Sequence, residues 1–169
     1  ILGQDLLFLV MNYVPGPTRR RWLEESEAGN EPLVRELGAQ LAQALATLHT
    51  SGVVHLDLKP ENVFLSEQEP GLDQVKILDF GIAHLRASPG GSPPPRDHAG
   101  QLLGTPEYWS PEQASGGPVD ARSDLYSLGA SFYKVFTGQI PFEANSVMNQ
   151  LFKHRFEAPP DPSVLNPEL

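Results

Sequence analysis

A short polar stretch at residues 55–62, His-Leu-Asp-Leu-Lys-Pro-Glu-Asn, carries most of the groups in this chain that could do chemistry. It follows the apolar pair Val53-Val54 and precedes the apolar run Val63-Phe64-Leu65. We therefore expect a tight loop between two buried β-type segments. The loop presents three groups at fixed offsets: the carboxylate of Asp57, the ammonium of Lys59 and the carboxamide of Asn62.

A second acidic turn, Asp79-Phe80-Gly81, follows another apolar pair, Ile77-Leu78. The two apolar arms would thus each end in an oxygen ligand of the kind that Mg²⁺ requires. Such an arrangement suits phosphoryl transfer, because that reaction depends mostly on positioning and on neutralisation of charge.

Three motifs in order resemble those of protein kinases: H-x-D-x-K-P-E-N at 55–62, L-D-F-G at 78–81, and G-T-P-E-Y-W-S-P-E at 104–112. They resemble the catalytic loop, the metal-binding turn and the substrate loop. The sequence P-E-Q-A at 111–114 most resembles the corresponding motif of the bacterial serine/threonine kinases that are related to the eukaryotic ones. The resemblance, which runs from about Leu6 to Phe142, implies an α+β, protein-kinase-like fold.

The resemblance also implies a division of the chain. Residues 1–16 would be the last small-lobe strand and the hinge, residues 17–158 the mainly α-helical large lobe, and residues 159–169 a Pro-rich truncated end. Within the large lobe lie the catalytic loop, 55–62, and the activation segment, 79–112. The rest of the small lobe, with its glycine-rich loop and its lysine–glutamate pair, is largely absent, so we expect this chain alone to have little or no activity.

The resemblance implies ATP and Mg²⁺ as cofactors and a role for each polar residue. Asp57 would orient the substrate hydroxyl and accept its proton, and Lys59 would hold the transferring γ-phosphate. Thr105 would reach toward both. Asp79 would bind the Mg²⁺ that bridges the β- and γ-phosphates, and Asn62 would bind a second Mg²⁺.

The adenine site is implied in the same way. The backbone from Asn12 to Val14 would hydrogen-bond adenine, with Met11 at the back of the pocket and Phe64 under the ring. A lysine two residues after the catalytic aspartate, here Lys59, is the serine/threonine-kinase pattern. The implied partner is therefore a protein substrate with Ser or Thr.

One departure from the family is Leu56, which stands where arginine usually precedes the catalytic aspartate. That arginine normally pairs with a phosphate on the activation loop. Leucine cannot, so we predict that activity is not switched on through this contact. Between residues 83 and 104 only Ser88 and Ser92 could be phosphorylated as serine or threonine.

Three neighbouring residues have structural interpretations. His55 follows an apolar pair and is better explained as a packed residue than as a base. Asp124, by resemblance, would hydrogen-bond the backbone of the catalytic loop. Glu112 pairs in the family with an arginine from a later helix. Because no arginine follows Arg155, we expect Glu112 to be unpaired or exposed.

Periodicity predicts the supporting elements. Apolar residues recur every three or four positions from Pro32, which predicts a helix that ends at Gly52: Leu33, Val34, Leu37, Leu41, Leu45 and Leu48. A second helix is predicted over Asp120–Thr137, with the run 125–129 buried, and a short one over 145–152. Residues 66–74 predict a hairpin with Pro70-Gly71 at its tip.

The amino-acid composition excludes several classes of function. The 169 residues are 40% hydrophobic, which indicates a globular chain, and the net charge of −9 argues against a nucleic-acid partner. There is no cysteine, so thiol catalysis and disulfides are excluded. The longest apolar run, Leu6 to Met11, is too short for a membrane segment, and we expect a cytoplasmic protein. The Ser/Pro/Gly-rich stretch 87–100 predicts mobility.

Two alternatives stay open. The chain could be a pseudokinase or a regulatory binding module, because half of the nucleotide clamp is missing. It could, less favourably, be a small-molecule phosphotransferase of the same fold, which shares H-x-D-x-x-x-x-N. The segment 104–112 argues against that alternative, because in the family it seats a peptide.

Overall fold

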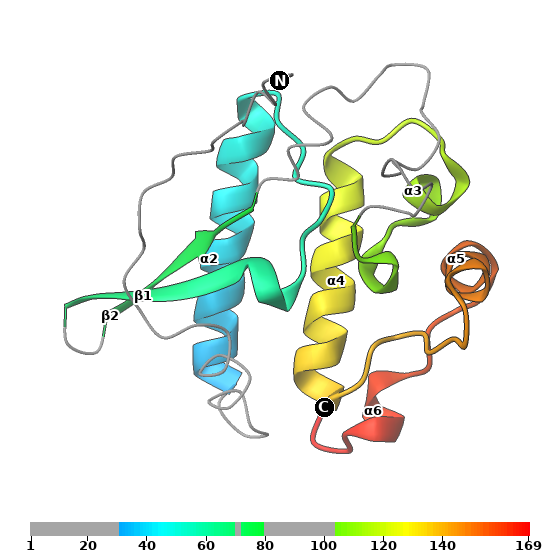
Figure 1. Ribbon diagram of the computed structural model, residues 1–169. Coiled ribbons are helices and arrows are strands. Elements are labelled where there is room, and N and C mark those ends of the chain that lie inside the picture. The colour runs from blue at the N-terminus through cyan, green and yellow to red at the C-terminus, as the bar shows by residue number, and fades with distance from the viewer. Residues whose placement is uncertain (1–30, 70–71, 80–103) are drawn as a thin grey trace, which may run out of the picture.

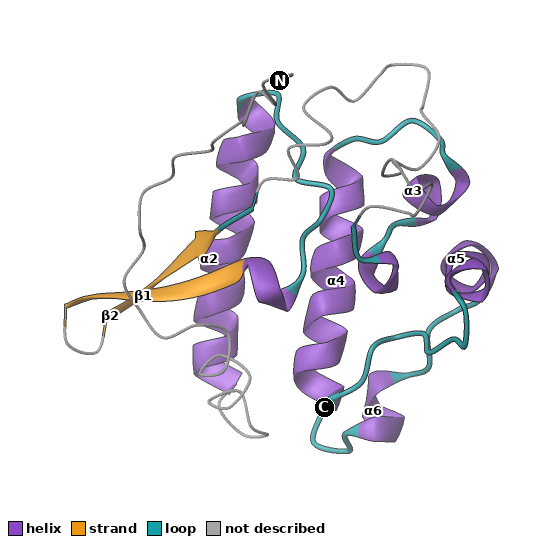
Figure 2. Cartoon of the chain, in the orientation of Figure 1, coloured by secondary structure: helices purple, strands orange, loops and turns teal. Residues whose placement is uncertain are grey.

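The computed structural model describes residues 31–69, 72–79 and 104–169 (Figure 1). The strand and hinge predicted within residues 1–16, including Met11, Asn12 and Val14, lie outside these ranges. So does the Ser/Pro/Gly-rich stretch 87–100. The described part is mostly helical, with one two-stranded sheet (Figure 2).

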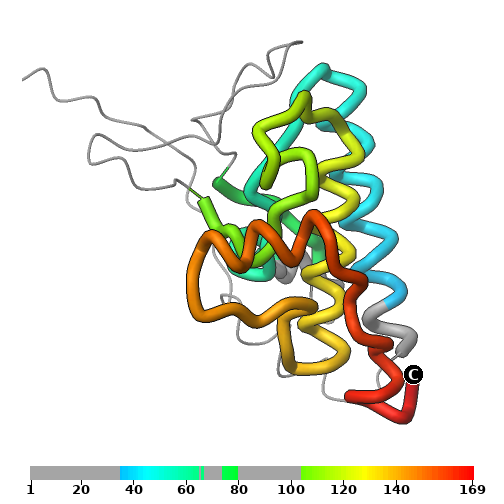
Figure 3. Tube along the Cα trace, turned by 90° about the vertical axis from the view of Figure 1, so that its right-hand side faces the viewer, coloured from blue at the N-terminus to red at the C-terminus, as the bar shows by residue number. Residues whose placement is uncertain are grey.

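Two long helices, α2 (Glu31–Thr50) and α4 (Ala121–Thr137), lie side by side at the centre (Figure 1). The hairpin of β1 (Val63–Glu69) and β2 (Leu72–Ile77) packs on α2. Three shorter helices lie on the other side of α4: α3 (Pro111–Ser115), α5 (Val147–Phe156) and α6 (Pro162–Leu165). Viewed from that side, α5 lies in front of α4, and α2 lies behind it (Figure 3).

The apolar face predicted for α2 forms the main core. Leu37, Leu41 and Leu45 are at most 1% exposed and pack with Leu58, Val63, Val75, Ile77 and Val135. The predicted stop is also confirmed. Gly52 has φ 73°, and Val53 N–H bonds to the Leu48 carbonyl at 3.1 Å, which closes the last turn.

That closing bond explains one wrong prediction. Val53-Val54 lies outside any strand, because its first N–H is used by the helix end. The strands of the predicted hairpin are confirmed, with Val63 opposite Ile77 and Glu69 opposite Leu72, whereas the predicted tip, Pro70-Gly71, lies outside the described residues. Gln40 of α2 accepts a hydrogen bond from Val75 N–H at 2.8 Å, so the hairpin is tied to the helix by a polar contact as well as by the core.

Helix α4 begins after Asp120, whose side chain accepts from Arg122 N–H at 2.8 Å, and it ends at Gly138 with φ 74°. Its buried residues are mostly small or polar in the first half of the helix, and Val135 near its end joins the apolar core: Ser123, Asp124, Ser127, Ala130, Ser131 and Val135. The prediction that the run 125–129 is buried is wrong at Leu125, which is 54% exposed, and at Gly129, which is also exposed. Asp124 and Ser127 take the inward side, and one position along a helix turns the side chain by about 100°.

The C-terminal part differs from the prediction in length. Helix α5 begins after its N-cap Ser146 and continues to Phe156, beyond the predicted end at 152. Helix α6 was not predicted, although Asp161 before Pro162 is a helix-start pattern. Asn166 donates to the Phe136 carbonyl at 2.9 Å, which fixes this end of the described chain on α4. None of the helices in the described ranges has the length and apolar content needed to cross a membrane.

Candidate active site

The catalytic-loop residues that the sequence singled out lie together. Lys59 Nζ is 3.1 Å from Asp57 Oδ2 and donates to Thr105 Oγ1 at 2.6 Å. Both charged side chains are 21% exposed, so the pair is partly accessible to solvent. Asn62 Nδ2 donates to the Asp57 carbonyl at 2.8 Å. Lys59 therefore bridges Asp57 and Thr105, two residues 48 positions apart in the chain.

The backbone enters this loop in an unusual conformation. Leu56 has φ 63°, in the left-handed region that a branched side chain rarely adopts. The cost of such a residue is about 1–3 kcal/mol, and surrounding contacts must hold it. Leu56 N–H donates to Asp124 Oδ1 at 2.8 Å, and the Leu56 side chain is buried.

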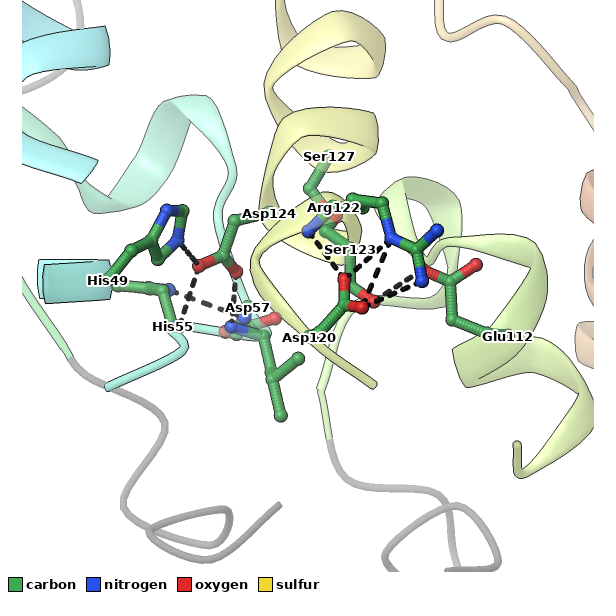
Figure 4. A network of polar contacts seen from close by, with 10 residues as sticks. His49, His55, Asp57, Glu112, Asp120, Arg122, Ser123, Asp124 and Ser127 are labelled. Carbon is green, nitrogen blue, oxygen red and sulfur yellow. Dashed lines mark hydrogen bonds and ion pairs between the residues drawn. The ribbon is translucent and has the colours of Figure 1, made fainter. Parts of the chain in front are cut away.

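Asp124 supports the loop from α4 (Figure 4). Its carboxylate is 0% exposed and accepts from His55 N–H at 2.9 Å as well as from Leu56 N–H. His49 Nε2 lies 2.8 Å from Asp124 Oδ2. The predicted contact between Asp124 and the loop backbone is thus confirmed. A buried carboxylate needs such partners, because desolvation would otherwise exclude its charged form.

Sequence reasoning missed His49. It lies in the last turn of α2, one residue after the last leucine of the apolar face. The available signal was a histidine six residues before His55, which places it at the end of the helix that leads into the catalytic loop. Its partner is 75 positions away, so only the fold brings the two together.

His55 is fully buried, as predicted for a packed residue. Its Nδ1 accepts from Asp57 N–H at 3.3 Å, and its Nε2 lies 3.2 Å from the Leu78 carbonyl. These partners fit the neutral tautomer with the proton on Nε2. Since Leu78 N–H also donates to the Asn62 carbonyl at 2.8 Å, two bonds join the catalytic loop to the strand that leads into Asp79.

Asn62 and Asp79 supply the oxygen ligands proposed for Mg²⁺. Asn62 is 4% exposed, and its amino group is used by Asp57, so Oδ1 is the end left for a ligand. Asp79 is exposed and has φ 54°, a conformation that aspartate tolerates better than most residues. The described residues contain no group of three acids or histidines that could form an all-protein cage. Few protein ligands, all oxygen, fit Mg²⁺ held largely by phosphates.

The predicted substrate segment follows. It begins at Gly104, with φ 107°, where an added Cβ would lie 3.1 Å from the Trp109 indole nitrogen. Only glycine combines this backbone with so close an aromatic ring. Tyr108 and Trp109 are buried, and Ser127 of α4 donates to the Tyr108 carbonyl at 2.8 Å. The segment is therefore fixed on α4, and Thr105 within it reaches Lys59.

Glu112 has a partner, contrary to the prediction. Its Oε1 accepts a hydrogen bond from the Ser123 hydroxyl, and the residue is half-buried (Figure 4). The prediction considered only arginines, whereas a buried serine in the first turn of α4 supplies the donor. Helix α3 is thereby joined to the start of α4.

Phe64 lies on β1 and is half-buried, opposite Lys76 in the hairpin. Asn12 and Val14, the other residues predicted to contact adenine, fall outside the described ranges. The structure thus brings together Asp57, Lys59, Asn62 and Thr105. The predicted roles of these residues in binding and catalysis stay predictions.

A second buried cluster holds α5 against the substrate segment. His154 is 3% exposed; its Nδ1 lies 2.8 Å from the Tyr126 hydroxyl, and its Nε2 lies 3.1 Å from Gln150 Nε2. Burial lowers the pKa of His154 to about 4, although the backbone of Glu107 and Pro106 counteracts this in part. Burial also raises the pKa of Tyr126 to about 12. Both rings are therefore neutral near pH 7.

These features define a class of protein. A helical lobe positions a loop with Asp57, Lys59 and Asn62 beside a hairpin, and a separate segment with Thr105 closes onto it. This is the arrangement of a protein kinase catalytic lobe. The family described as Protein kinase domain matches residues 2–164, and the chain belongs to this family.

Similar proteins are bacterial serine/threonine kinases. The chain is 42% identical over 162 residues to serine/threonine-protein kinase pkn3 of Myxococcus xanthus, covering 96% of this chain and 29% of that protein. It is 39% identical over 162 residues to Pkn1 of the same organism, covering 96% and 22%. It is 39% identical over 159 residues to PknB of Mycobacterium tuberculosis, covering 94% and 24%. The chain thus spans less than a third of the length of these relatives.

Proposed function

We propose that these residues form the catalytic lobe of a kinase that transfers the γ-phosphate of ATP to serine or threonine hydroxyls of proteins. The observation that carries the proposal is the contact of Lys59 with both Asp57 and Thr105. Thr105 belongs to the segment that would seat the substrate peptide, so the contact joins the acceptor site to the residues of phosphoryl transfer.

In the proposed reaction, Asp57 holds the substrate hydroxyl by accepting its hydrogen bond. As the oxygen bonds to the γ-phosphorus and the bond to the leaving oxygen breaks, the hydroxyl proton moves to the Asp57 carboxylate. Lys59 Nζ lies 3.1 Å from that carboxylate and also donates a hydrogen bond to Thr105 Oγ1. Its ammonium group neutralises negative charge on the transferring phosphoryl group.

Asn62 Oδ1 and the Asp79 carboxylate are the residues that would hold Mg²⁺. When bound, the ion neutralises phosphate charge and orients the phosphates for in-line displacement. The protein's part is to fix these ligands. Asn62 is anchored by its bonds to Asp57, and the strand before Asp79 is anchored through Leu78.

Serine and threonine are the favoured acceptors for two reasons. Lys59 stands two residues after Asp57, as in serine/threonine kinases, and the relatives named above are serine/threonine kinases by name. The position of Thr105 beside Lys59 supports the same assignment. We also propose that the catalytic domain is cytoplasmic, which is the expectation drawn from the sequence.

The test uses the longest natural protein that contains these 169 residues. It is incubated with Mg²⁺, γ-labelled ATP and a mixed protein substrate, and the labelled residues are identified by mass spectrometry. We expect phosphoserine and phosphothreonine from the parent and from Glu143→Gln, an exposed acid-to-amide control. We expect neither from Asp57→Asn. Label on small alcohols alone would favour a small-molecule phosphotransferase, and nucleotide binding without transfer would favour a binding module.

A further inference from the structure

Gln113, the residue after Pro-Glu in the substrate segment, makes contacts to two separate parts of the site. Its Oε1 accepts from Ser110 N–H at 3.1 Å, and its backbone N–H donates to Ser110 Oγ at 3.3 Å. These two bonds cap the start of α3. Its remaining group, Nε2, donates to the Leu56 carbonyl at 2.8 Å, 57 positions away.

The Leu56 carbonyl is a sensitive point of the catalytic loop. Leu56 is in the left-handed conformation, and its carbonyl shares one planar peptide unit with the N–H of Asp57. A hydrogen bond to this oxygen therefore restricts the rotation of the peptide unit that leads into Asp57. On the other side of Leu56, the N–H is held by Asp124 from α4. The residue before the proposed base is thus clamped from two helices.

We propose that Gln113 is a positioning residue that couples the seated substrate segment to the orientation of Asp57. This inference rests on the proposed function of the site. Thr105 joins that segment to Lys59, and Gln113, the residue that follows the segment, joins it to Leu56. The loop is thus held at two places, once at a side chain and once at its backbone.

The coupling is uncharged. Leu56 stands where the family usually has an arginine, and its backbone N–H and carbonyl form the hydrogen bonds at this position. The amide of Gln113 binds that backbone without any modification.

The variants Gln113→Glu and Gln113→Met separate the two contacts of the side chain. Both remove the donor to Leu56, whereas Glu keeps an acceptor for the Ser110 N–H. Ser110→Ala is the matched control, since it removes half of the α3 cap and leaves the donor to Leu56 in place. All are made in the longest natural protein, at a temperature where each is folded.

The first measurement is hydrogen exchange at the Asp57 amide, resolved to single residues by fragmentation mass spectrometry. We expect exchange about tenfold faster in both Gln113 variants, the effect of one lost hydrogen bond to the loop, and within twofold of the parent in Ser110→Ala. Unchanged exchange in the Gln113 variants, or equal acceleration in all three, would overturn the inference.

The second measurement is steady-state phosphate transfer. We expect kcat to fall about tenfold in both Gln113 variants with the KM for ATP unchanged, whereas Ser115→Ala, at an exposed position of α3 outside the substrate segment, should keep kcat within twofold. Loss confined to the KM for ATP would overturn the inference. If the parent shows no Asp57-dependent transfer, the proposed function fails, while the exchange result still decides whether Gln113 positions Asp57.

Discussion

Replacement of Asp124 by asparagine probes the support of the catalytic loop. The carboxylate lies at the centre of three hydrogen bonds, from His55 N–H at 2.9 Å, Leu56 N–H at 2.8 Å and His49 Nε2 at 2.8 Å. The amide keeps one acceptor oxygen. Its amino group then faces at least one donor, because Oδ1 and Oδ2 each bind a different backbone N–H.

The magnitude follows from these contacts. A hydrogen bond to a charged group contributes about 1.5–3 kcal/mol, and at least one is lost and replaced by a donor–donor contact. A buried donor left without an acceptor costs about a further 1–3 kcal/mol. We therefore expect Asp124→Asn to lower the free energy of unfolding by about 3 kcal/mol, a large part of the roughly 5–15 kcal/mol that holds a domain folded.

Urea denaturation followed by tryptophan fluorescence measures this change, since Trp109 is buried against Ala114 of α3 and Leu151 of α5. Asp79→Asn is the matched control. Asp79 is exposed with φ 54°, a conformation that asparagine also tolerates, so its effect should stay within about 0.5 kcal/mol. A loss below about 1 kcal/mol for Asp124→Asn would refute the argument that the buried carboxylate supports the loop.

Two further predictions concern pH and glycine. The pKa of His154 is lowered to about 4 from about 6.5 when unfolded, so the unfolded chain binds more protons between these values. The free energy of unfolding should thus fall by up to about 3 kcal/mol as the pH drops from 7 to 4. In urea titrations His154→Gln should flatten this pH profile, and an unchanged pH dependence would contradict the lowered pKa of His154. Gly104→Ala should destabilise by about 1–2 kcal/mol because of its φ of 107° and the nearby indole, whereas Gly129→Ala, on an exposed helical position with open space, should stabilise by about 0.5–1 kcal/mol. The melting temperatures of the two variants should shift in opposite directions. Shifts in the same direction would show that the local backbone geometry does not determine the sign of the stability change.

Local patterns sufficed for much of the scaffold. The leucines at 37, 41 and 45 recur at helical spacing, and Gly52 provides the left-handed stop, so α2 could be predicted from its own residues. The hairpin was equally local, since only two residues separate its strands. The family resemblance then placed Asp57, Lys59 and Thr105 in one site, because three ordered motifs constrain the fold more than any one of them.

The failures depend on partners far apart in the chain. Leu125 is exposed because Asp124 and Ser127 occupy the inward face of α4 to hold the catalytic loop and the substrate segment. Hydropathy alone favours the opposite orientation. The contacts of His49 with Asp124 and of Glu112 with Ser123 likewise appear only when α4 is in place.

The most direct test of the account is the rate of phosphate transfer in a single turnover, measured for the parent, Asp57→Asn and Glu143→Gln. General-base residues typically contribute about 10²–10⁴-fold. We expect Asp57→Asn to slow transfer to protein serine or threonine at least about 100-fold, and Glu143→Gln to match the parent. Transfer by Asp57→Asn within threefold of the parent would contradict the central claim that Asp57 is the base of this site.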